Sequence, residues 1–489
     1  MCKKTNYSIN IMKNKELIKL ISRAAFENPF TEEREELDLK IVGENKNLSR
    51  NSIINKVIKI SSDTIKQIKN KNINNYRGEE KQDIIYLFLF DVYHKYREKF
   101  DDLIIKQIAA GDVSQKVIFS NSAISDLIKY GFDEKEAERY FSIFYQMRRA
   151  FYFIFNTLPG KSDCMKEFHR SLWDNIFTHD IRLFEKNLWN KMEDFSTLLL
   201  GETGTGKGTA AAAIGRSGFI PFNVKSESFE ESFTKTFVQI NLSQFPETLI
   251  ESELFGHQKG AFTGAIDAHE GIFSISSSCG SIFLDEIGDV SIPVQIKLLR
   301  VLQDRIFSPV GSHKSLRFDG RVIAATNKSI DKLRQEGAFR DDFFYRLCSD
   351  IIIVPSLRQR ILENSSELPL LLKKTINKIT TEDSREIYDM VYKTVISTLG
   401  KNYSWPGNVR ELEQCVRRIL LTKRYNGDLK PVSKSLQNKI TDDIDAGNYD
   451  AQGLMEDYCK LLYQRHGTYQ EVARKTGLDR RTVKKYLKF

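Results

Sequence analysis

A glycine-rich turn in the middle of the chain has the residues that hold a phosphate group. An apolar run ends at Leu200, the turn closes on Lys207, and the residues that follow can open a helix. Glycines let backbone N–H groups curl around an anion, a helix N-terminus adds partial positive charge, and the lysine ammonium reaches the terminal phosphates. The predicted nucleotide site is Gly201, Glu202, Thr203, Gly204, Thr205, Gly206, Lys207, Gly208 and Thr209.

Two carboxylates follow a second apolar run further along the chain. Residues 281–284 are apolar apart from their first member and lead into Asp285 and Glu286. Asp285 is suited to hold Mg²⁺ through water, and Glu286 to polarise the water that attacks the γ-phosphate. A phosphate loop usually has Ser or Thr directly after its lysine to bind the metal, whereas this chain has Gly208. We therefore predict ATP hydrolysis with Mg²⁺ held at Asp285.

The elements that position these motifs are short β-rich runs, each followed by a helical segment. The predicted strands are residues 195–200, 237–242, 281–284, 321–326 and 350–354. Alternating strands and helices imply a parallel sheet that is covered on both faces. The next segment, 357–423, is helical in pattern, and the polar stretch 424–452 is typical of a linker.

The bulk composition limits the classes of protein that fit. A chain of 489 residues divides into about three units, and no apolar run approaches the roughly 18 residues that span a bilayer. The polar start lacks the apolar core of a signal peptide, so a cytoplasmic protein without membrane contact is expected. Six cysteines lie far apart without paired spacing, which suggests neither a zinc site nor a disulfide framework.

Between the two motifs, residues 260–265 read Gly-Ala-Phe-Thr-Gly-Ala. By residue type alone this is either a flexible loop that offers Phe262 and Thr263 to a partner or a turn in the core. In this position it resembles the signature of the sigma-54-dependent activators, a branch of the AAA+ ATPases, and the similarity runs from about Cys164 to Lys423. The resemblance implies that sigma-54 and RNA polymerase are partners. It also implies that the sigma factor is contacted through Gly260, Ala261, Phe262, Thr263, Gly264 and Ala265.

The same resemblance implies roles for residues outside the two motifs. Asn241 is similar to the residue that restrains the catalytic glutamate, and Asn327 to the sensor that follows the fourth strand. Arg410, in the segment 405–412, resembles the lid residue that contacts the nucleotide. Arg340 and Arg346 resemble arginine fingers, which reach the γ-phosphate of a neighbouring subunit, so a ring, usually a hexamer, is implied.

The end of the chain has the spacing of a helix-turn-helix. A short helix, a turn at Gly477 and a second helix capped by Asp479 would bury Val472 and Val483 together. It also resembles the Fis-type tail of these activators. The predicted contacts to double-stranded DNA are Arg480, Arg481, Thr482, Lys484 and Lys485.

The expected fold is an α/β AAA+ parallel sheet with a helical lid, preceded by a mainly helical region and followed by a small all-α domain. The expected boundaries are 1–163 (regulatory, unassigned), 164–356 (ATPase), 357–423 (lid), 424–452 (linker) and 453–489 (helix-turn-helix). Residues 1–40 lack the strand with paired acids that opens a phosphorylatable receiver domain. The expected function is an ATP-driven activator that binds upstream DNA, forms a ring and remodels the closed promoter complex into the open one. Two alternatives stay open: a AAA+ remodeller of another target, and a non-enzymatic DNA-binding repressor with a degenerate nucleotide site at Gly208.

Overall fold

The computed structural model describes residues 15–487, except 44–47, 381–383, 402, 428–439, 441–442, 445–446, 448 and 467. It divides the chain into two compact units, Met1–Arg424 and Tyr425–Phe489. Most of the predicted linker 424–452 lies outside the described residues. Within the described residues, no helix combines the length and the apolar character needed to cross a membrane.

The first unit contains a five-stranded sheet in which every neighbouring pair of strands is parallel. Its strands, in spatial order, are β4 (Phe237–Asn241), β5 (Ser281–Asp285), β8 (Arg321–Thr326), β1 (Thr197–Leu200) and β9 (Asp350–Ile353). All five predicted strands are confirmed, with differences only at their ends. Two neighbouring parallel strands need a crossover connection that returns the chain to the same end of the sheet, and this connection is usually a helix. Such helices cover both faces of the sheet.

Successive residues of each strand point to opposite faces, so the sheet has two cores. On one face, Leu199, Phe283 and Ile323 pack against helix α9 (Lys207–Gly215). On the other face of the sheet, Leu198, Ile282 and Ala324 form a second core together with apolar residues of the helices that cover this face. The helices of that second face are α10 (Glu247–Phe255), α11 (Ile272–Ile275), α12 (Ile292–Asp304), α13 (Ile330–Gln335) and α14 (Asp341–Leu347).

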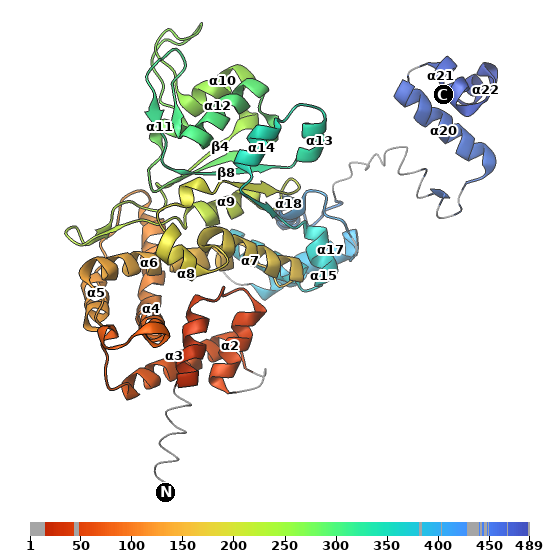
Figure 1. Ribbon diagram of the computed structural model, residues 1–489. Helices are drawn as coiled ribbons and strands as arrows, with labels where there is room; N and C mark the ends of the chain where they lie inside the picture. Colours follow the sequence, from red (N-terminus) through yellow and green to blue (C-terminus); the bar gives the residue numbers. More distant parts are fainter. Residues whose placement is uncertain are drawn as a thin grey trace. The chain divides into compact units, whose positions relative to one another are not determined.

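The N-terminal region is helical, as predicted, and shares its core with the first face of the sheet. Residues 15–26 form a helix, followed by α2 (Glu32–Val42), α3 (Arg50–Gln67), α4 (Gly78–Ala110), α5 (Ser120–Lys129), α6 (Glu134–Thr157), α7 (Asp163–Phe177) and α8 (Ile181–Leu183). Figure 1 shows α6 and α7 between the N-terminal helices and the sheet, and both pack directly on α9. The buried guanidinium of Arg149 in α6 donates 2.7 Å hydrogen bonds to the carbonyls of Arg216 and Gly218, just beyond α9. The predicted regulatory region and the ATPase region thus belong to one compact unit.

The lid follows the sheet and consists of α15 (Leu357–Glu363), α16 (Glu367–Ile379), α17 (Arg385–Leu399) and α18 (Asn408–Thr422). The second unit contains α20 (Ala451–His466), α21 (Tyr469–Thr476) and α22 (Arg480–Tyr486). Two antiparallel hairpins, β2 (Phe222–Asn223) with β3 (Ser228–Phe229) and β6 (Ile306–Phe307) with β7 (Leu316–Arg317), were not predicted. Strands of this length show no periodicity, because alternation needs about four residues to be seen.

Candidate nucleotide site and partner surfaces

The carboxyl ends of the parallel strands meet at one edge of the sheet, and four of the predicted catalytic residues, Asn241, Asp285, Glu286 and Asn327, lie there. The register pairs Asn241 with Asp285 and Leu200, the last residue before the phosphate loop, with Thr326. Asn327 directly follows Thr326. Four segments that are distant in sequence therefore meet because parallel strands end on the same side.

The phosphate loop is folded around its own lysine. Gly204 and Gly206 have positive φ angles of 80° and 106°, which glycine adopts without steric cost. Lys207 opens α9, and its Nζ donates to the carbonyls of Gly201 at 2.9 Å and Glu202 at 3.3 Å. Burial lowers the pKa of Lys207, and the charges of Glu286 and Asp285 oppose that shift. A nucleotide phosphate would take the place of these carbonyl contacts, so the loop fits an anion.

Gly208 does not disturb the start of helix α9. A side chain at this position would first meet the Phe283 ring, with 3.8 Å between its Cβ and ring atom Cε1. Thr209 is exposed one position further along the helix. The absence of the usual hydroxyl after Lys207 therefore changes the metal ligands available to the site and leaves the fold of the loop intact.

The two carboxylates at the end of β5 have different surroundings. Asp285 accepts a 3.4 Å hydrogen bond from the Asn241 side chain, and its pKa is raised by burial and by the neighbouring Glu286. Glu286 has a positive φ of 56°, which is rare for a residue with a side chain and typical of functional sites. Its Oε2 accepts hydrogen bonds from the Asn327 backbone at 3.2 Å and the Thr326 hydroxyl at 3.5 Å.

Asn327 joins the acidic pair to the phosphate loop. While its backbone N–H binds Glu286, its side-chain amide donates to the Thr203 hydroxyl at 2.8 Å. These two contacts place Asn327 between the acidic pair and the loop, and its predicted role as a sensor stays a prediction. Asn241 differs from the expectation in its partner, since its side-chain amide donates to Asp285 rather than to Glu286. Its proposed restraint of the glutamate stays a prediction.

The lid closes over the phosphate loop through residues that were not predicted as site residues. Asn408 is buried, and its amide donates at 3.1 Å to both the Glu202 carboxylate and the Thr203 carbonyl. Arg358 forms an ion pair with Glu202 and donates to its Oε2 at 2.8 Å, which lowers the pKa of that carboxyl. Asn408 belongs to the segment 405–412, whose pattern could have pointed to it. Nothing in the sequence pairs Arg358 with Glu202.

The backbone of the lid also touches the loop. The N–H groups of Val409 and Arg410 point at the Gly204 carbonyl, at 3.0 and 3.3 Å. A side chain at Gly204 would collide with the Gly407 carbonyl oxygen, so this close approach requires glycine. The Arg410 side chain itself is exposed beside the loop. Its predicted contact with the nucleotide stays a prediction.

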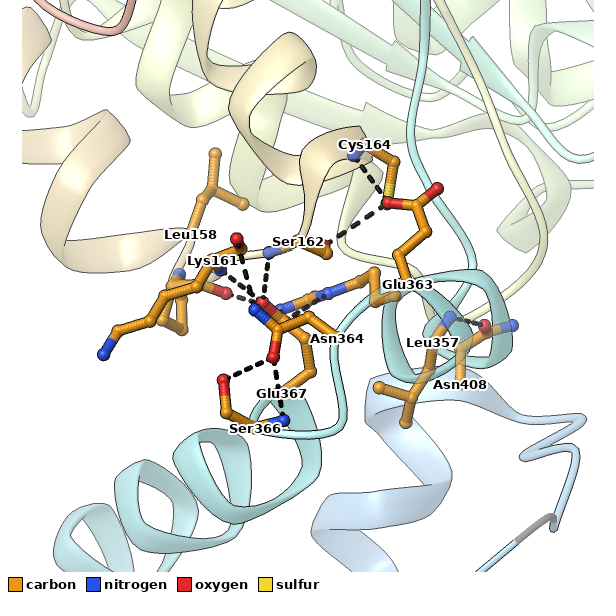
Figure 2. A network of polar contacts seen from close by, with 12 residues as sticks. Leu158, Lys161, Ser162, Cys164, Leu357, Glu363, Asn364, Ser366, Glu367 and Asn408 are labelled. Carbon is orange, nitrogen blue, oxygen red and sulfur yellow. Dashed lines mark hydrogen bonds and ion pairs between the residues drawn. The ribbon is translucent and has the colours of Figure 1, made fainter.

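A second polar network joins the lid to the segment between α6 and α7 (Figure 2). Glu367, at the start of α16, is fully buried and accepts hydrogen bonds from the Arg360 Nε at 3.0 Å and from the Ser162 backbone at 2.8 Å. Lys161 also donates its backbone N–H to Glu367. Close by, Glu363 accepts from the Cys164 backbone at 2.7 Å. The end of the predicted regulatory region is thereby fixed to the lid.

The segment predicted to contact the sigma factor forms a tight turn beyond α10. The Gly260 N–H donates to the Ala265 carbonyl at 2.8 Å, and the Ala265 N–H donates to the Phe262 carbonyl at 3.0 Å. The Phe262 ring lies 4.9 Å from the His257 ring and is half-buried, while Thr263 is exposed at the tip. Of the two interpretations left open, the exposed loop is the one that the fold adopts.

The two predicted arginine fingers lie at the two ends of α14, Arg340 just before its first residue and Arg346 in its last turn, and have partners away from the phosphate loop of their own chain. Arg340 forms a bidentate pair with Asp342, and the Arg346 Nε donates to the Leu302 carbonyl at 2.9 Å. Both guanidinium groups are partly exposed. Their predicted action on a neighbouring subunit stays a prediction.

The second unit contains the expected helix–turn–helix order. Gly477 has a positive φ of 69° between α21 and α22, and the Asp479 side chain caps α22 by accepting from the Arg481 N–H at 2.7 Å. Val472 and Val483 are buried in the core of this unit. Arg480, Arg481, Lys484 and Lys485 are exposed on the second helix, and Thr482 is half-buried.

Comparison with known proteins identifies the central part of the chain. Residues 181–352 match the family described as Sigma-54 interaction domain, and residues 363–443 match the AAA+ ATPase lid domain. The Nif-specific regulatory protein of Bradyrhizobium diazoefficiens is 41% identical over 236 residues, which cover 48% of this chain and 37% of that protein.

Two further relatives give the same extent of similarity. The regulatory protein AtoC of Escherichia coli is 38% identical over 240 residues, 48% of each chain. The DNA-binding transcriptional regulator NtrC of Azospirillum brasilense is 37% identical over 262 residues, 54% of this chain and 47% of that protein. The chain thus spans about half or less of the length of these curated relatives.

Proposed function

Through its central and lid domains the chain belongs to the family of sigma-54-dependent activators, and from this premise we propose that it hydrolyses ATP to remodel sigma-54 RNA polymerase at promoters. The observation that supports this best is the meeting of Lys207, Asp285, Glu286 and Asn327 at one sheet edge. Hydrolysis of a γ-phosphate needs a phosphate loop and a carboxylate that orients water, and here Asn327 connects the two, through its side chain to Thr203 and its backbone N–H to Glu286.

Each residue of the site has a separate task in this reaction. Lys207 and the loop N–H groups bind the phosphates, and Glu286 orients the attacking water, its carboxylate held in place by the Asn327 backbone. Asp285 would hold Mg²⁺ through water, and that metal would neutralise charge on the phosphates. Asn327 contacts both Glu286 and Thr203, so it responds to the loss of the γ-phosphate.

The chain acts in this proposal as a ring of identical subunits, a hexamer as is usual for the family. Arg340, at the start of α14, and Arg346, in its last turn, are partly exposed and leave the phosphate loop of their own chain without a guanidinium from that helix. A guanidinium from a neighbour would stabilise the charge on the transferred phosphate, which couples hydrolysis to assembly.

The exposed turn 260–265 contacts sigma-54 in this proposal. It extends from α10, which follows the strand that ends at Asn241. A change at the nucleotide site can therefore reach Thr263 through one strand and one helix. The basic face of α22 binds upstream DNA and raises the local concentration of the activator near its promoter.

Two variants of the whole protein test this function and the alternatives. We expect Lys207→Ala to abolish ATP hydrolysis, because the ammonium that binds the phosphates is lost; unchanged turnover would remove the assigned site. Thr263→Ala is expected to keep the ATPase rate but to fail in opening a sigma-54 promoter in a purified transcription assay. Normal promoter opening by this variant would favour a remodeller of another target, and a wild-type protein without ATPase activity would favour the repressor.

A further inference from the structure

The N-terminal helices enclose a cavity of about 480 Å³ that none of the predicted site residues line. Its walls come from the helix 15–26, from α2, α3, α4, α6, α7 and α8, and from Glu185 beyond α8. The volume lies in the range of about 300–1,000 Å³ in which proteins bind small molecules. A hollow of this size in a core of closely packed aromatic residues is unexpected unless something fills it.

Most of the wall is apolar and aromatic. Phe90, Phe144, Met147, Phe151 and Trp173 line it from three different helices. Phe151 also stacks on Phe30 and Phe155, so its ring is fixed in place. Rigid aromatic walls favour a ligand with an apolar body, since they bury its surface with little loss of side-chain entropy.

The polar groups of the wall differ in whether they have partners. Arg148 forms a bidentate pair with Asp101 at 2.5 and 2.7 Å, and Arg34 donates to Asp38 at 3.0 Å. Arg97, in contrast, has no hydrogen bond with any residue that the structure describes. Its side chain is only 23% exposed, and its nearest carboxylate, Glu98, is 3.9 Å away and 89% exposed.

His94 adds a second polar group without a partner. Its Nδ1 is buried and makes no hydrogen bond within the described part of the chain. Burial and the nearby charges of Arg34, Arg97 and Arg148 lower the pKa of His94 well below its ordinary value, so the imidazole is neutral. Of the three guanidinium groups near this neutral ring, those of Arg34 and Arg148 are paired with carboxylates, so Arg97 carries the positive charge that lacks a hydrogen-bonded counter-ion.

The carboxylates of the wall offset this charge only in part. Asp101 is paired with Arg148, Glu98 extends into solvent, and Glu185 accepts a hydrogen bond from Tyr140 at 3.1 Å. Burial raises the pKa of Glu185. Glu27 also lines the cavity and is half-exposed. A partly buried cation without a hydrogen-bonded partner is costly, and an anionic ligand would supply that partner.

We propose that this cavity is a binding site for a small organic anion with an apolar body, whose acidic group binds Arg97. An isolated phosphate or other compact ion fits poorly, because it would leave the aromatic wall unfilled. A neutral apolar molecule would fill the wall but leave Arg97 without an acceptor. The site is independent of the nucleotide site and of the proposed ATPase function.

Calorimetric titration of the full-length protein with 1-naphthoate and with decanoate tests the proposal. We expect at least one of these anions to bind at one site per chain, and the matched neutral 1-naphthalenemethanol and the cationic 1-naphthylmethylamine to bind more weakly. Arg97→Gln should weaken binding of the anion by about tenfold or more, because a hydrogen bond to a charged group is lost. Arg23→Gln removes the same charge from an exposed position outside the cavity and should leave binding unchanged.

A second variant reports on the cavity itself. Ala25→Phe fills part of the cavity, so it should abolish binding of both the anion and its neutral analogue. Circular dichroism and the thermal transition of the variant check that the chain is folded. The proposal is overturned if neither anion binds at millimolar concentration, if the amine binds in preference, or if a bound anion is indifferent to both Arg97→Gln and Ala25→Phe.

Discussion

The amide of Asn408, buried in the lid, donates a 3.1 Å hydrogen bond to the carboxylate of Glu202 in the phosphate loop. The same amide reaches the Thr203 carbonyl, and its oxygen accepts from the Leu357 N–H at 2.8 Å. One side chain therefore joins the phosphate loop, the first lid helix and the last lid helix. Its backbone has a positive φ of 53°.

Asn408→Asp is expected to loosen the lid from the phosphate loop. The carboxylate can still accept from Leu357, but it loses both donors and faces the charge of Glu202. We expect the free energy of unfolding to fall by roughly 1–3 kcal/mol, as for buried groups that lose their partners, and the KM for ATP to rise. Urea denaturation and ATPase assays measure these effects. Asn190→Asp, at an exposed position, is the matched control, and equal behaviour of the two variants would contradict the role of Asn408.

Mixing two inactive variants tests whether arginine fingers act between subunits. Lys207→Ala lacks a working phosphate loop, and Arg346→Ala lacks the finger, which is worth about 10³–10⁵-fold in rate in other enzymes of this chemistry. In a mixed ring, the intact loop of the Arg346→Ala subunit can receive Arg346 from its neighbour. We expect the mixture to recover ATPase activity, measured by phosphate release.

The control for this experiment is a mixture of Lys207→Ala with the double variant Lys207→Ala/Arg346→Ala, in which no interface is complete. It should remain inactive. If the first mixture is also no more active than its separate components, Arg346 does not act between subunits, and Arg340→Ala can be examined in the same way.

Asp285→Asn should stabilise the protein without nucleotide at neutral pH. The pKa of Asp285 is raised above its ordinary value of 3.8, chiefly by burial, so the ionised form is disfavoured in the folded state. This penalty is complete above the raised pKa and disappears as the pH falls below 3.8, where folded and unfolded chains are both protonated. Urea denaturation across this range should show a gain at pH 7 that shrinks in acid. Asp331→Asn, at an exposed position, is the control and should not change the free energy of unfolding in a pH-dependent way. If the increase in the free energy of unfolding of Asp285→Asn is also independent of pH, burial of the charge is not its cause.

Glu367→Gln should destabilise the junction of the lid and the N-terminal helices. Glu367 and Arg360 form an ion pair with 0% and 5% of their side chains exposed, and removal of one charge leaves the other buried without its counter-ion. Such a change costs about 3–5 kcal/mol. The exposed Glu386→Gln serves as control.

The double variant Arg360→Met/Glu367→Gln separates charge from packing. It retains an acceptor for the backbone N–H of Ser162 but leaves no unpaired cation, so it should be more stable than Glu367→Gln alone in urea denaturation. Additive losses from the two substitutions would show that the ion pair is not the cause.

Lys484→Gln should weaken binding to duplex DNA of any sequence and reduce the slope of binding against salt concentration by about one. Lys484 is exposed on α22, where it can contact a phosphate. Fluorescence anisotropy at several salt concentrations measures the slope. Lys401→Gln removes an exposed lysine from the first unit and should leave the slope unchanged.

The sequence by itself determined the elements and the chemistry that lies within single segments. The strand that ends at Leu200, the glycines before Lys207 and the acids after residue 284 could be read directly, because local sequence sets periodicity, turns and capping. The helix-turn-helix was also legible, since Gly477 and the buried Val472 and Val483 lie within a few residues of each other.

Only the tertiary structure decided which distant residues meet. Arg358 with Glu202, and Glu367 with the turn at Ser162, are separated by more than a hundred residues. No local pattern predicts such pairs, because they depend on how the sheet and lid are packed. The partner of Asn241 and the cavity beside Arg97 also depend on tertiary packing, because each is formed by segments that are distant in the sequence. The local sequence predicts each helix or strand, but it does not predict which of them come into contact.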